Sequence, residues 1–222
     1  MAASRNSLQN SLPARVAAFL ATRTMPGENI CVGLSGGCDS VVLLHVLAVL
    51  CPRGNLRAVH VHHGLSENAD CWAAFCADYC RDLGIDLLVE RVEVDRHSGL
   101  GLEAAAREAR YRVFSGSAGE LLLLGHHQGD QAETLLFNLL RGAGVAGAAG
   151  IPVERRRQQL RILRPLLDVS RDAIETYARD HQLAWVDDES NRDTGLSRNF
   201  LRHRVLTVLA GRFPAAERNL AQ

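Results

Sequence analysis

The chain has 222 residues, of which 47% are hydrophobic and 23% are charged, and its formal net charge is zero. This length and balance fit one well-buried globular domain with at most a small appendage. All 25 basic side chains are arginines. Chemistry that needs a lysine amine of the protein itself, such as a Walker-type phosphate lysine or a Schiff base, is therefore excluded.

The six cysteines do not form an evident metal or disulfide framework, because no two of them have the C-x-x-C spacing. Cys71, Cys76 and Cys80 fall on helical spacings with aromatic residues, which favours helix packing. No secretory segment opens the chain, and no apolar run approaches the ~20 residues of a membrane span. We therefore expect a reduced, cytoplasmic protein without a membrane segment.

Short runs rich in Val, Ile and Leu alternate with longer runs of helical periodicity along the first two thirds of the chain. The predicted strands are 30–34, 56–62, 87–92 and 121–125, and the predicted helices are 38–51, 67–83, 102–116 and 130–141. Consecutive apolar residues, as in the last strand, suit a parallel sheet buried on both faces. The predicted fold class is α/β, a doubly wound, mostly parallel, Rossmann-like sheet with helices on both faces.

The pattern changes after about residue 150. A charged stretch over 154–164 precedes a predicted helix over 170–181, capped by Ser170, and a second predicted helix over 197–209. We expect this part of the chain to complete the sheet edge and then to cover it with helices.

The stretch GLSGGCDS at 33–40 joins the first predicted strand to the first predicted helix. Gly36 and Gly37 let the backbone adopt positive φ and approach a ligand closely, and the helix start offers free amides with roughly +0.5 charge. This combination binds phosphate oxygens, and Asp39 fits there if a divalent cation separates it from the phosphate. The alternative is a structural glycine turn in which Asp39 caps the helix.

A second loop, GHHQGDQAET at 125–134, follows the fourth predicted strand. In an open parallel sheet, ligands lie beyond the carboxyl ends of the strands, where the strand order reverses. If the first and fourth strands are neighbours, this loop meets GLSGGCDS there. The argument for a cation next to Asp39 then applies to Asp130 as well.

SGGCDS at 35–40 resembles the S-G-G-x-D-S loop of the N-type ATP pyrophosphatases, or PP-loop superfamily, which split ATP into AMP and pyrophosphate. From about residue 28 to 212, further segments are similar to successive signatures of the tRNA(Ile)-lysidine synthetase family. These segments are HVHHGLSENAD at 60–70, GLEAAAREARY at 101–111, HHQGDQAETLLFNLLRGAG at 126–144, RPLLDVSRDAI at 164–174 and DDESNRDTGLSRNFLRHRVL at 187–206.

The resemblance implies a fold of the adenine nucleotide alpha hydrolase type. It implies a PP-loop catalytic domain over 1–212, with 213–222 as the start of a linker helix toward C-terminal domains. The implied activity is that of an ATP-dependent ligase. ATP adenylates the C2 oxygen of the wobble cytidine of tRNA(Ile) with a CAU anticodon, and the amine of free L-lysine then displaces AMP. ATP and Mg²⁺ are the expected cofactors, and a homodimer is a candidate assembly.

The loops and the resemblance together give a set of candidate site residues. The catalytic candidates are Asp39, His127, Asp130, Arg198 and Arg202. Among them, Asp39 and Asp130 would share Mg²⁺, and His127 would polarise the α-phosphate or handle a proton. The ATP-binding candidates are Ser35, Gly36, Gly37, Cys38, Asp39, Ser40 and His62. The substrate or tRNA candidates are Arg110, Arg112, Asp188, Glu189, Asn191, Arg198 and Asn199.

Some assignments stay open at this point. Arg198 and Arg202 are one helical turn apart and could together clamp an AMP-linked cytidine or a phosphate. The acids at 187–189 either bind the lysine amine or cap a helix. Glu133 either serves the site or caps its loop, and Gly129 stands where the family usually carries an acidic or amide side chain. The five arginines between 155 and 164 are candidates for RNA contact.

Two other functions would use the same loop. A tRNA base thiolating enzyme of the same superfamily would activate a base oxygen in a similar way, but it needs catalytic cysteines, for which Cys38 is a poor substitute. A non-catalytic nucleotide-binding protein would keep the loop, but it would have little use for Asp130 and the arginine pair. Lysine-dependent release of AMP distinguishes the ligase from both.

Overall fold

The computed structural model describes residues 11–95, 101–144, 147, 149–193, 195 and 197–222. At its centre lies a six-stranded sheet with the strand order β3-β2-β1-β4-β6-β5. The strands are β1 (Ile30–Gly33), β2 (Leu56–His62), β3 (Asp86–Arg91), β4 (Leu121–Leu123), β5 (Glu154–Arg157) and β6 (Leu160–Leu163). Neighbouring strands are parallel, except for β5 and β6, which pair antiparallel at one edge.

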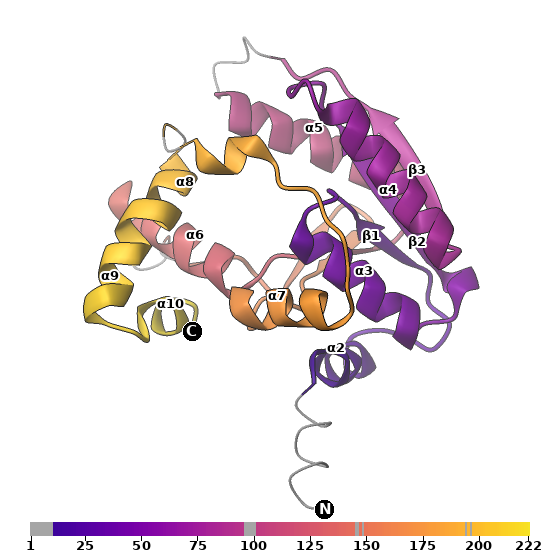
Figure 1. Ribbon diagram of the computed structural model, residues 1–222, viewed down its shortest axis with the longest axis horizontal. Coiled ribbons are helices and arrows are strands. Elements are labelled where there is room, and N and C mark those ends of the chain that lie inside the picture. The colour runs from indigo at the N-terminus through magenta and orange to yellow at the C-terminus, as the bar shows by residue number, and fades with distance from the viewer. Residues whose placement is uncertain (1–10, 96–100, 145–146, 148, 194, 196) are drawn as a thin grey trace, which may run out of the picture.

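Helices cover both faces of this sheet (Figure 1). One core joins the sheet to α2 (Leu12–Ala21), α3 (Cys38–Leu50), α4 (Ala69–Leu83) and α7 (Arg171–Asp180). A second core, on the opposite face, joins it to α5 (Leu102–Ser117). Cys31 and Val32, which are adjacent in β1, lie in different cores because successive side chains of a strand point to opposite faces. The predicted doubly wound α/β class is confirmed.

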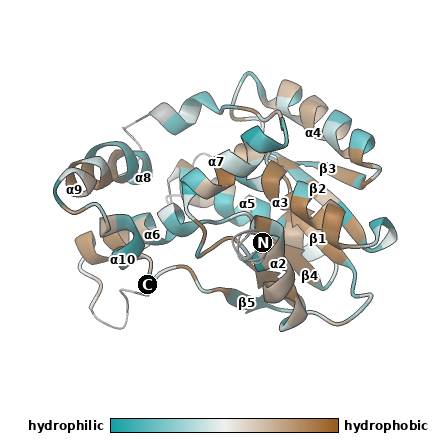
Figure 2. Ribbon diagram, turned by 60° about the horizontal axis from the view of Figure 1, so that its bottom comes forward, coloured by the Kyte–Doolittle hydropathy of each residue, from teal (hydrophilic) through white to brown (hydrophobic). Residues whose placement is uncertain are grey.

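α3 is buried nearly all round, because its sequence carries apolar residues on every side. Val41, Val42, Leu43 and Leu44 are each fully buried, and both α3 and β1 are brown at the centre of Figure 2. His45 interrupts this apolar run, and its Nδ1 makes a 3.0 Å hydrogen bond with the Tyr177 hydroxyl of α7. Within the described residues, no helix has the length and apolar character needed to cross a membrane.

The predicted elements of the first two thirds of the chain are confirmed, with boundaries that differ by about two residues or fewer. The neighbourhood of the first and fourth strands is also confirmed, since β1 lies between β2 and β4. From β1 the chain moves first to β2 and β3 on one side, and later to β4 and β6 on the other. The carboxyl end of β1 is therefore the switch point at which a ligand is expected.

The carboxyl-terminal part agrees only partly with expectation. β5 and β6 complete the sheet edge, and the Ser170 hydroxyl caps α7 by accepting a hydrogen bond from the Ala173 amide at 3.3 Å. The remaining helices do not cover that edge, which corrects the prediction. They pack beside α6 (Gln128–Leu140), which extends away from the sheet (Figure 1). They are α8 (Ser197–Phe200), a π-helical segment (Leu201–Leu206), α9 (Thr207–Arg212) and α10 (Ala216–Leu220).

The described residues also contain two short 3-10 helices, η1 (Arg53–Asn55) and η2 (Glu189–Arg192). The segment between α7 and η2, residues 181–188, is called the strap here. It passes α3 and β1 as the orange trace in Figure 1. Its Val186 amide donates a 2.9 Å hydrogen bond to the Gly36 carbonyl, so the strap is attached to the loop that follows β1.

Candidate functional site

The loop from Ser35 to Ser40 leads from β1 into the first turn of α3. Gly36 has φ +90°, as expected for a residue that only glycine suits well. The same expectation for Gly37 is wrong, because Gly37 is the extended N-cap residue of α3 with φ −73°. Among the described residues, no side chain caps this helix start. Its first amides can therefore receive an anion.

The two serine hydroxyls of the loop have different surroundings. The Ser40 hydroxyl is buried and donates to the Gly37 carbonyl at 2.9 Å while it accepts from the Ser35 amide at 3.1 Å. It therefore braces the loop, whereas Ser35 is exposed. Cys38 is buried in the core, where burial raises the pKa of its thiol to about 11. It can offer a ligand its backbone amide, but it is not a thiolate nucleophile.

The second predicted loop touches the first. A Cβ atom added at Gly125 would lie 3.0 Å from the backbone carbon and oxygen of Asp39, so the absence of a side chain at Gly125 permits this approach. The contact follows from the pairing of β4 with β1, which brings the carboxyl ends of both strands together. The two loops therefore meet at the carboxyl ends of β1 and β4, as the sequence predicted.

His127 is the N-cap residue of α6 and is buried. Its Nδ1 accepts a hydrogen bond from the Gly129 amide at 3.0 Å, while Asp130 Oδ2 accepts one from the His127 amide at 2.9 Å. These two bonds form a capping box. Because Nδ1 acts as an acceptor, the neutral ring carries its proton on Nε2.

The His127 Nε2 atom faces both predicted carboxylates. It lies 3.9 Å from Asp39 Oδ2 and 3.8 Å from Asp130 Oδ2. Burial raises the pKa of Asp39 above its usual value, although His127 and Arg171 oppose this effect. Burial also disfavours the charge on Asp130, but His127 and the hydrogen bond from its amide outweigh it, and the pKa of Asp130 is lowered.

Arg171 was missed by sequence reasoning, although it makes the closest contact to Asp39. Its Nη1 lies 2.8 Å from each of the two Asp39 carboxylate oxygens. It is the first residue of α7, and the positive end of a helix dipole is an unfavourable position for a cation. An arginine at the first position of a predicted helix was therefore the local sequence signal that could have identified Arg171 as a site residue.

Arg202 is brought to the site from the π-helical segment, as predicted. Its Nη2 lies 3.3 Å from Asp130 Oδ1, and its Nε and Nη2 donate to Glu133 Oε1 and Oε2 at 2.5 and 3.0 Å. Glu133 is buried, which raises its pKa despite the opposing charge of Arg202. Glu133 does not cap the loop, because Asp130 does so, and it instead fixes Arg202.

Arg198 does not share these partners. Its Nε lies 3.2 Å from Glu103 Oε1 at the start of α5. The predicted continuous helix over 197–209 is interrupted at Leu201–Leu206 by π-helical geometry, which widens the turn that contains Arg202. Arg198 therefore pairs with a carboxylate of α5, whereas Arg202 pairs with carboxylates of α6.

His62, one of the ATP-binding candidates, lies at the carboxyl end of β2, next to β1. The Nε2 atom of its buried ring lies 3.1 Å from Asp70 Oδ1 and 3.3 Å from Arg91 Nη1. Arg91 Nη2 donates to the same Asp70 oxygen at 2.6 Å. Asp70 thus fixes the orientation of the His62 ring.

The predicted substrate residues near the strap are largely engaged in local structure. Asp188 accepts from the Ser190 amide at 2.8 Å and caps η2, which supports the capping alternative for this residue. Glu189 accepts from the Ser66 hydroxyl at 2.6 Å. Asn199 is buried, and its side-chain nitrogen donates to the carbonyls of Ser190 and Asp193.

Asn191 is exposed and contributes its carbonyl to a 2.8 Å hydrogen bond with His203 Nε2. Arg110 and Arg112 are both exposed on α5, but they are two residues apart, so they point to different sides of the helix. Tyr111 between them is buried against the sheet. The structure therefore does not bring this arginine pair together.

The arginines of 155–164 are not a single RNA-facing cluster. Arg164 is buried and donates to the Pro152 carbonyl at 2.6 Å. Arg161 forms ion pairs with Glu28 and Glu154. Arg155 and Arg156, on the edge strand β5, are exposed.

Asp39 and Asp130 offer the hard oxygen ligands that Mg²⁺ prefers, and both approach the same imidazole nitrogen. Among the residues that the structure describes, no group of three or more His, Cys, Asp or Glu side chains is arranged to hold a metal ion by itself. One or two carboxylates completed by substrate phosphates is the usual manner of Mg²⁺ binding. The residues therefore fit a cation that arrives with a nucleotide.

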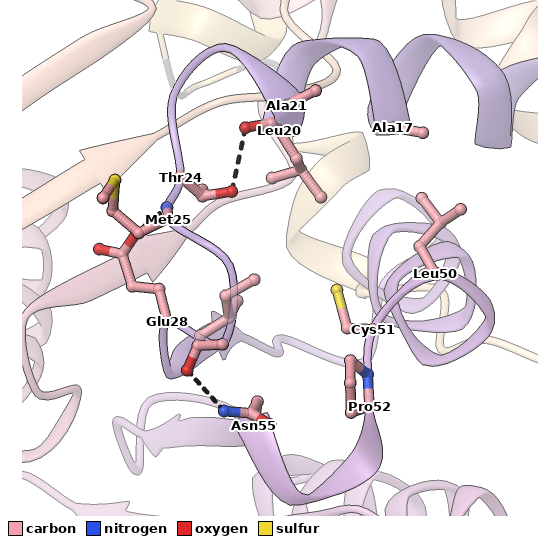
Figure 3. Close-up of a pocket in the computed structure, with 12 residues that line it drawn as sticks. Ala17, Leu20, Ala21, Thr24, Met25, Glu28, Leu50, Cys51, Pro52 and Asn55 are labelled. Carbon is pink, nitrogen blue, oxygen red and sulfur yellow. Dashed lines mark hydrogen bonds between the residues drawn. The ribbon is translucent and has the colours of Figure 1, made fainter.

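A separate pocket of about 250 Å³ lies at the opposite end of the sheet (Figure 3). Ala17 and Leu20 of α2 line one side of it, and Leu50 and Cys51, where α3 ends, line another. Among its lining residues, the Thr24 hydroxyl donates a 3.0 Å hydrogen bond to the Leu20 carbonyl. None of the predicted site residues lines this pocket.

A family model described as a PP-loop domain matches residues 8–209 of the chain. A tRNA(Ile)-lysidine synthase from Pseudomonas fluorescens is 50% identical over 196 residues, which cover 86% of this chain and 44% of the relative. Its counterpart from Pseudomonas syringae is 49% identical over 219 residues, which cover 96% of this chain and 48% of the relative. The chain thus spans about half the length of the curated relatives it matches.

Among solved structures, the U34-tRNA thiolase NcsA from Methanococcus maripaludis, which carries a 4Fe-4S cluster, has a TM-score of 0.72 and 18% sequence identity. The similarity covers 95% of this chain and 76% of the thiolase. An NH3-dependent NAD synthetase from Campylobacter jejuni has a TM-score of 0.52 at 17% identity, and the similarity covers 95% of this chain and 92% of the synthetase. Both likenesses concern the fold alone.

Proposed function

Since this chain belongs to the PP-loop domain family, whose members bind ATP, we propose that it carries the adenylating centre of a tRNA(Ile)-lysidine synthase. The observation that carries the proposal is the convergence of Asp39 and Asp130 on His127 Nε2, next to the uncapped start of α3. An anion cradle, two carboxylates and a proton donor are what an ATP pyrophosphatase needs in one place.

The proposed reaction has two steps. In the first, the C2 oxygen of the wobble cytidine in the CAU anticodon bonds to the α-phosphorus of ATP, the bond from that phosphorus to the β-phosphate oxygen breaks, and pyrophosphate leaves. In the second, the amine of free lysine bonds to C2 and loses a proton, while the bond from C2 to the adenylate oxygen breaks and AMP leaves. The amine comes from the substrate, so a chain without lysine can perform both steps.

The loop 35–40 would bind phosphate oxygens through the first amides of α3, and Gly36 supplies the φ of +90° that this turn requires. His127 would donate its Nε2 proton to a phosphate oxygen, since Nδ1 is held by the Gly129 amide. Asp39 and Asp130 would hold Mg²⁺, which when bound neutralises charge on the leaving pyrophosphate.

Arginine side chains on and beside α5 are proposed as the tRNA contacts. Arg198 is only partly exposed, and its pairing with Glu103 sets it at this position. Arg110 and Arg112 are exposed and lie on the same helix as Glu103. Arginine binds phosphates and base edges through its planar fork, so these residues would confer a salt-dependent affinity for RNA.

The thiolating alternative is disfavoured by the environment of the cysteines. Burial raises the pKa of Cys38 to about 11 and that of Cys76 to about 12, so neither thiol ionises near neutral pH. The similarity to a thiolase concerns the fold alone.

The proposal is tested by incubating the 222-residue chain with ATP, Mg²⁺, radiolabelled lysine and a CAU-anticodon tRNA(Ile) transcript. We expect pyrophosphate release and lysine incorporation, and neither with a transcript in which uridine replaces the wobble cytidine. An Asp39→Asn variant should lose on the order of 100-fold in pyrophosphate release. Turnover that requires a sulfur donor instead of lysine would assign the chain to the thiolating class.

A further inference from the structure

Arg171 stands at the end of a line of alternating charges along α7. Its Nε donates to Glu175 Oε1 at 2.8 Å, and Glu175 Oε2 lies 3.6 Å from Arg179 Nη1. At the other end, Arg171 Nη1 contacts both oxygens of Asp39. The line therefore leads from the solvent side of α7 to the loop that follows β1.

The backbone of α7 is firmly attached to α3, so the start of one helix is fixed relative to the start of the other (Figure 1). Ile174 is fully buried between them, and Tyr177 is hydrogen-bonded to His45. The Arg171 side chain itself is 41% exposed, whereas that of Asp39 is 25% exposed. The guanidinium can thus leave toward solvent without disturbing the packing of either helix, but the carboxylate cannot.

The Asp39 carboxylate needs a counter-charge in every state of the protein. Removing a charged group from water costs free energy. If a partly buried carboxylate loses its partner, a large part of this cost is no longer offset. In this structure the Arg171 guanidinium supplies the counter-charge and occupies both oxygens of Asp39. A divalent cation that binds Asp39 needs at least one of the same oxygens. The two positive charges are therefore in direct competition.

We propose that Arg171 is a positioning residue that acts as a displaceable counter-ion of Asp39, so that a divalent cation binds the loop only by releasing this guanidinium. The contact keeps the carboxylate aimed at the site before the cation arrives. It also lowers the affinity of the site for a cation that comes without nucleotide phosphates. This inference rests on the proposed function only in using Asp39 as a cation ligand.

The test measures Mn²⁺ binding to the 222-residue chain by electron paramagnetic resonance, with Mn²⁺ alone and no nucleotide, lysine or tRNA. We expect Arg171→Met to bind Mn²⁺ roughly fivefold more tightly than the unaltered chain, the scale of a partly exposed ion pair. Arg171→Lys, which retains a cation but has no planar fork, should lie between the two. Asp39→Asn should abolish the gain in the Arg171→Met background.

Arg179→Met is the matched control, because it removes the same charge from the same helix without any contact to Asp39. Its Mn²⁺ affinity should stay within twofold of the unaltered chain. Equal or weaker binding by Arg171→Met, or an equal gain in Arg179→Met, would overturn the proposal, as would the absence of Mn²⁺ binding in all of these proteins. Lysine incorporation is a separate measurement. A chain that fails to incorporate lysine can still show the competition at Asp39, and a chain that incorporates lysine can fail to show it.

Discussion

The guanidinium of Arg202 donates two hydrogen bonds to the carboxylate of Glu133, whose side chain is only 2% exposed. This pair joins α6 to the π-helical segment and directs the Arg202 Nη2 atom to Asp130. Removing the charged partner of a buried carboxylate strongly lowers the stability of a protein. Replacing both partners with apolar side chains often leaves the stability unchanged.

Arg202→Met should therefore lower the free energy of unfolding by about 2 kcal/mol, because Glu133 would remain buried without its counter-ion. The double variant Arg202→Met, Glu133→Leu should recover most of this loss. Urea unfolding followed by circular dichroism measures both. Arg198→Met is the matched control, since its ion pair with Glu103 is more exposed and should contribute less than ~1 kcal/mol. A double variant as unstable as the single one would contradict this role of the pair.

His127 has a structural role at Nδ1 and a proposed chemical role at Nε2, and two substitutions separate these roles. His127→Asn keeps an acceptor near the Nδ1 position for the Gly129 amide but removes the Nε2 donor. It should preserve stability, because Asn is a favourable N-cap residue, and reduce pyrophosphate release by roughly 10²–10³-fold. His127→Ala should lose the same activity and also about 1 kcal/mol of stability. Wild-type turnover by His127→Asn would rule out the Nε2 proton as part of the reaction.

Gly125 permits the contact between the two loops of the site. Gly125→Ala would place Cβ 3.0 Å from the Asp39 backbone, which should destabilise the protein by about 1–3 kcal/mol and weaken ATP binding. Gly116→Ala, in α5, is the control: its Cβ would meet nothing within 4 Å, and alanine should stabilise the helix by up to ~1 kcal/mol. Thermal unfolding and fluorescence titration with an ATP analogue measure the two effects. An unchanged ATP affinity in Gly125→Ala would show that ATP binding does not depend on the close contact between the two loops.

Burial, together with the charge of Arg110, lowers the pKa of His63 to about 4. The unfolded chain would protonate this residue near pH 6.5, so below that pH the unfolded state binds a proton that the folded state does not. The stability contributed by neutral His63 is therefore present above pH 6.5 and is lost as the pH falls toward 4. His63→Asn should remove up to ~1.4 kcal/mol per pH unit from the slope of unfolding free energy in this interval. Parallel curves for the two proteins between pH 4 and 7 would contradict the assignment.

The order and type of the main elements were predictable because their signals are local. Each of these signals lies within a short segment of the sequence. Examples are the apolar run of α3, the glycines before it and the alternation of strands and helices. The loops at 35–40 and 125–134 were predictable as one site because parallel strands bring their carboxyl ends to one edge. The topology of the sheet was therefore enough to predict that Asp39 and Asp130 lie close together.

The counter-ions of those carboxylates were not predictable in the same way. Arg171 meets Asp39 only because α7 packs on α3, and Glu133 meets Arg202 only because the terminal helices lie on α6 instead of the sheet edge. Each pair joins residues far apart in the sequence, and no periodicity encodes such a pairing. The π-helical turn around Arg202 likewise departs from the regular spacing on which helix prediction depends.

The hydrogen bond from Val186 to Gly36 bears on the order in which the domain can form during synthesis. Gly36 leaves the ribosome early, but the strap that holds it, the β4 strand beside it and the arginine that pairs with Asp39 are all made much later. Contacts between distant parts of a chain form slowly. A long loop must close, at a cost in conformational entropy, before such contacts can stabilise the structure. The loop 35–40 is encoded near the beginning of the domain, yet it should be among the last parts to acquire its final geometry.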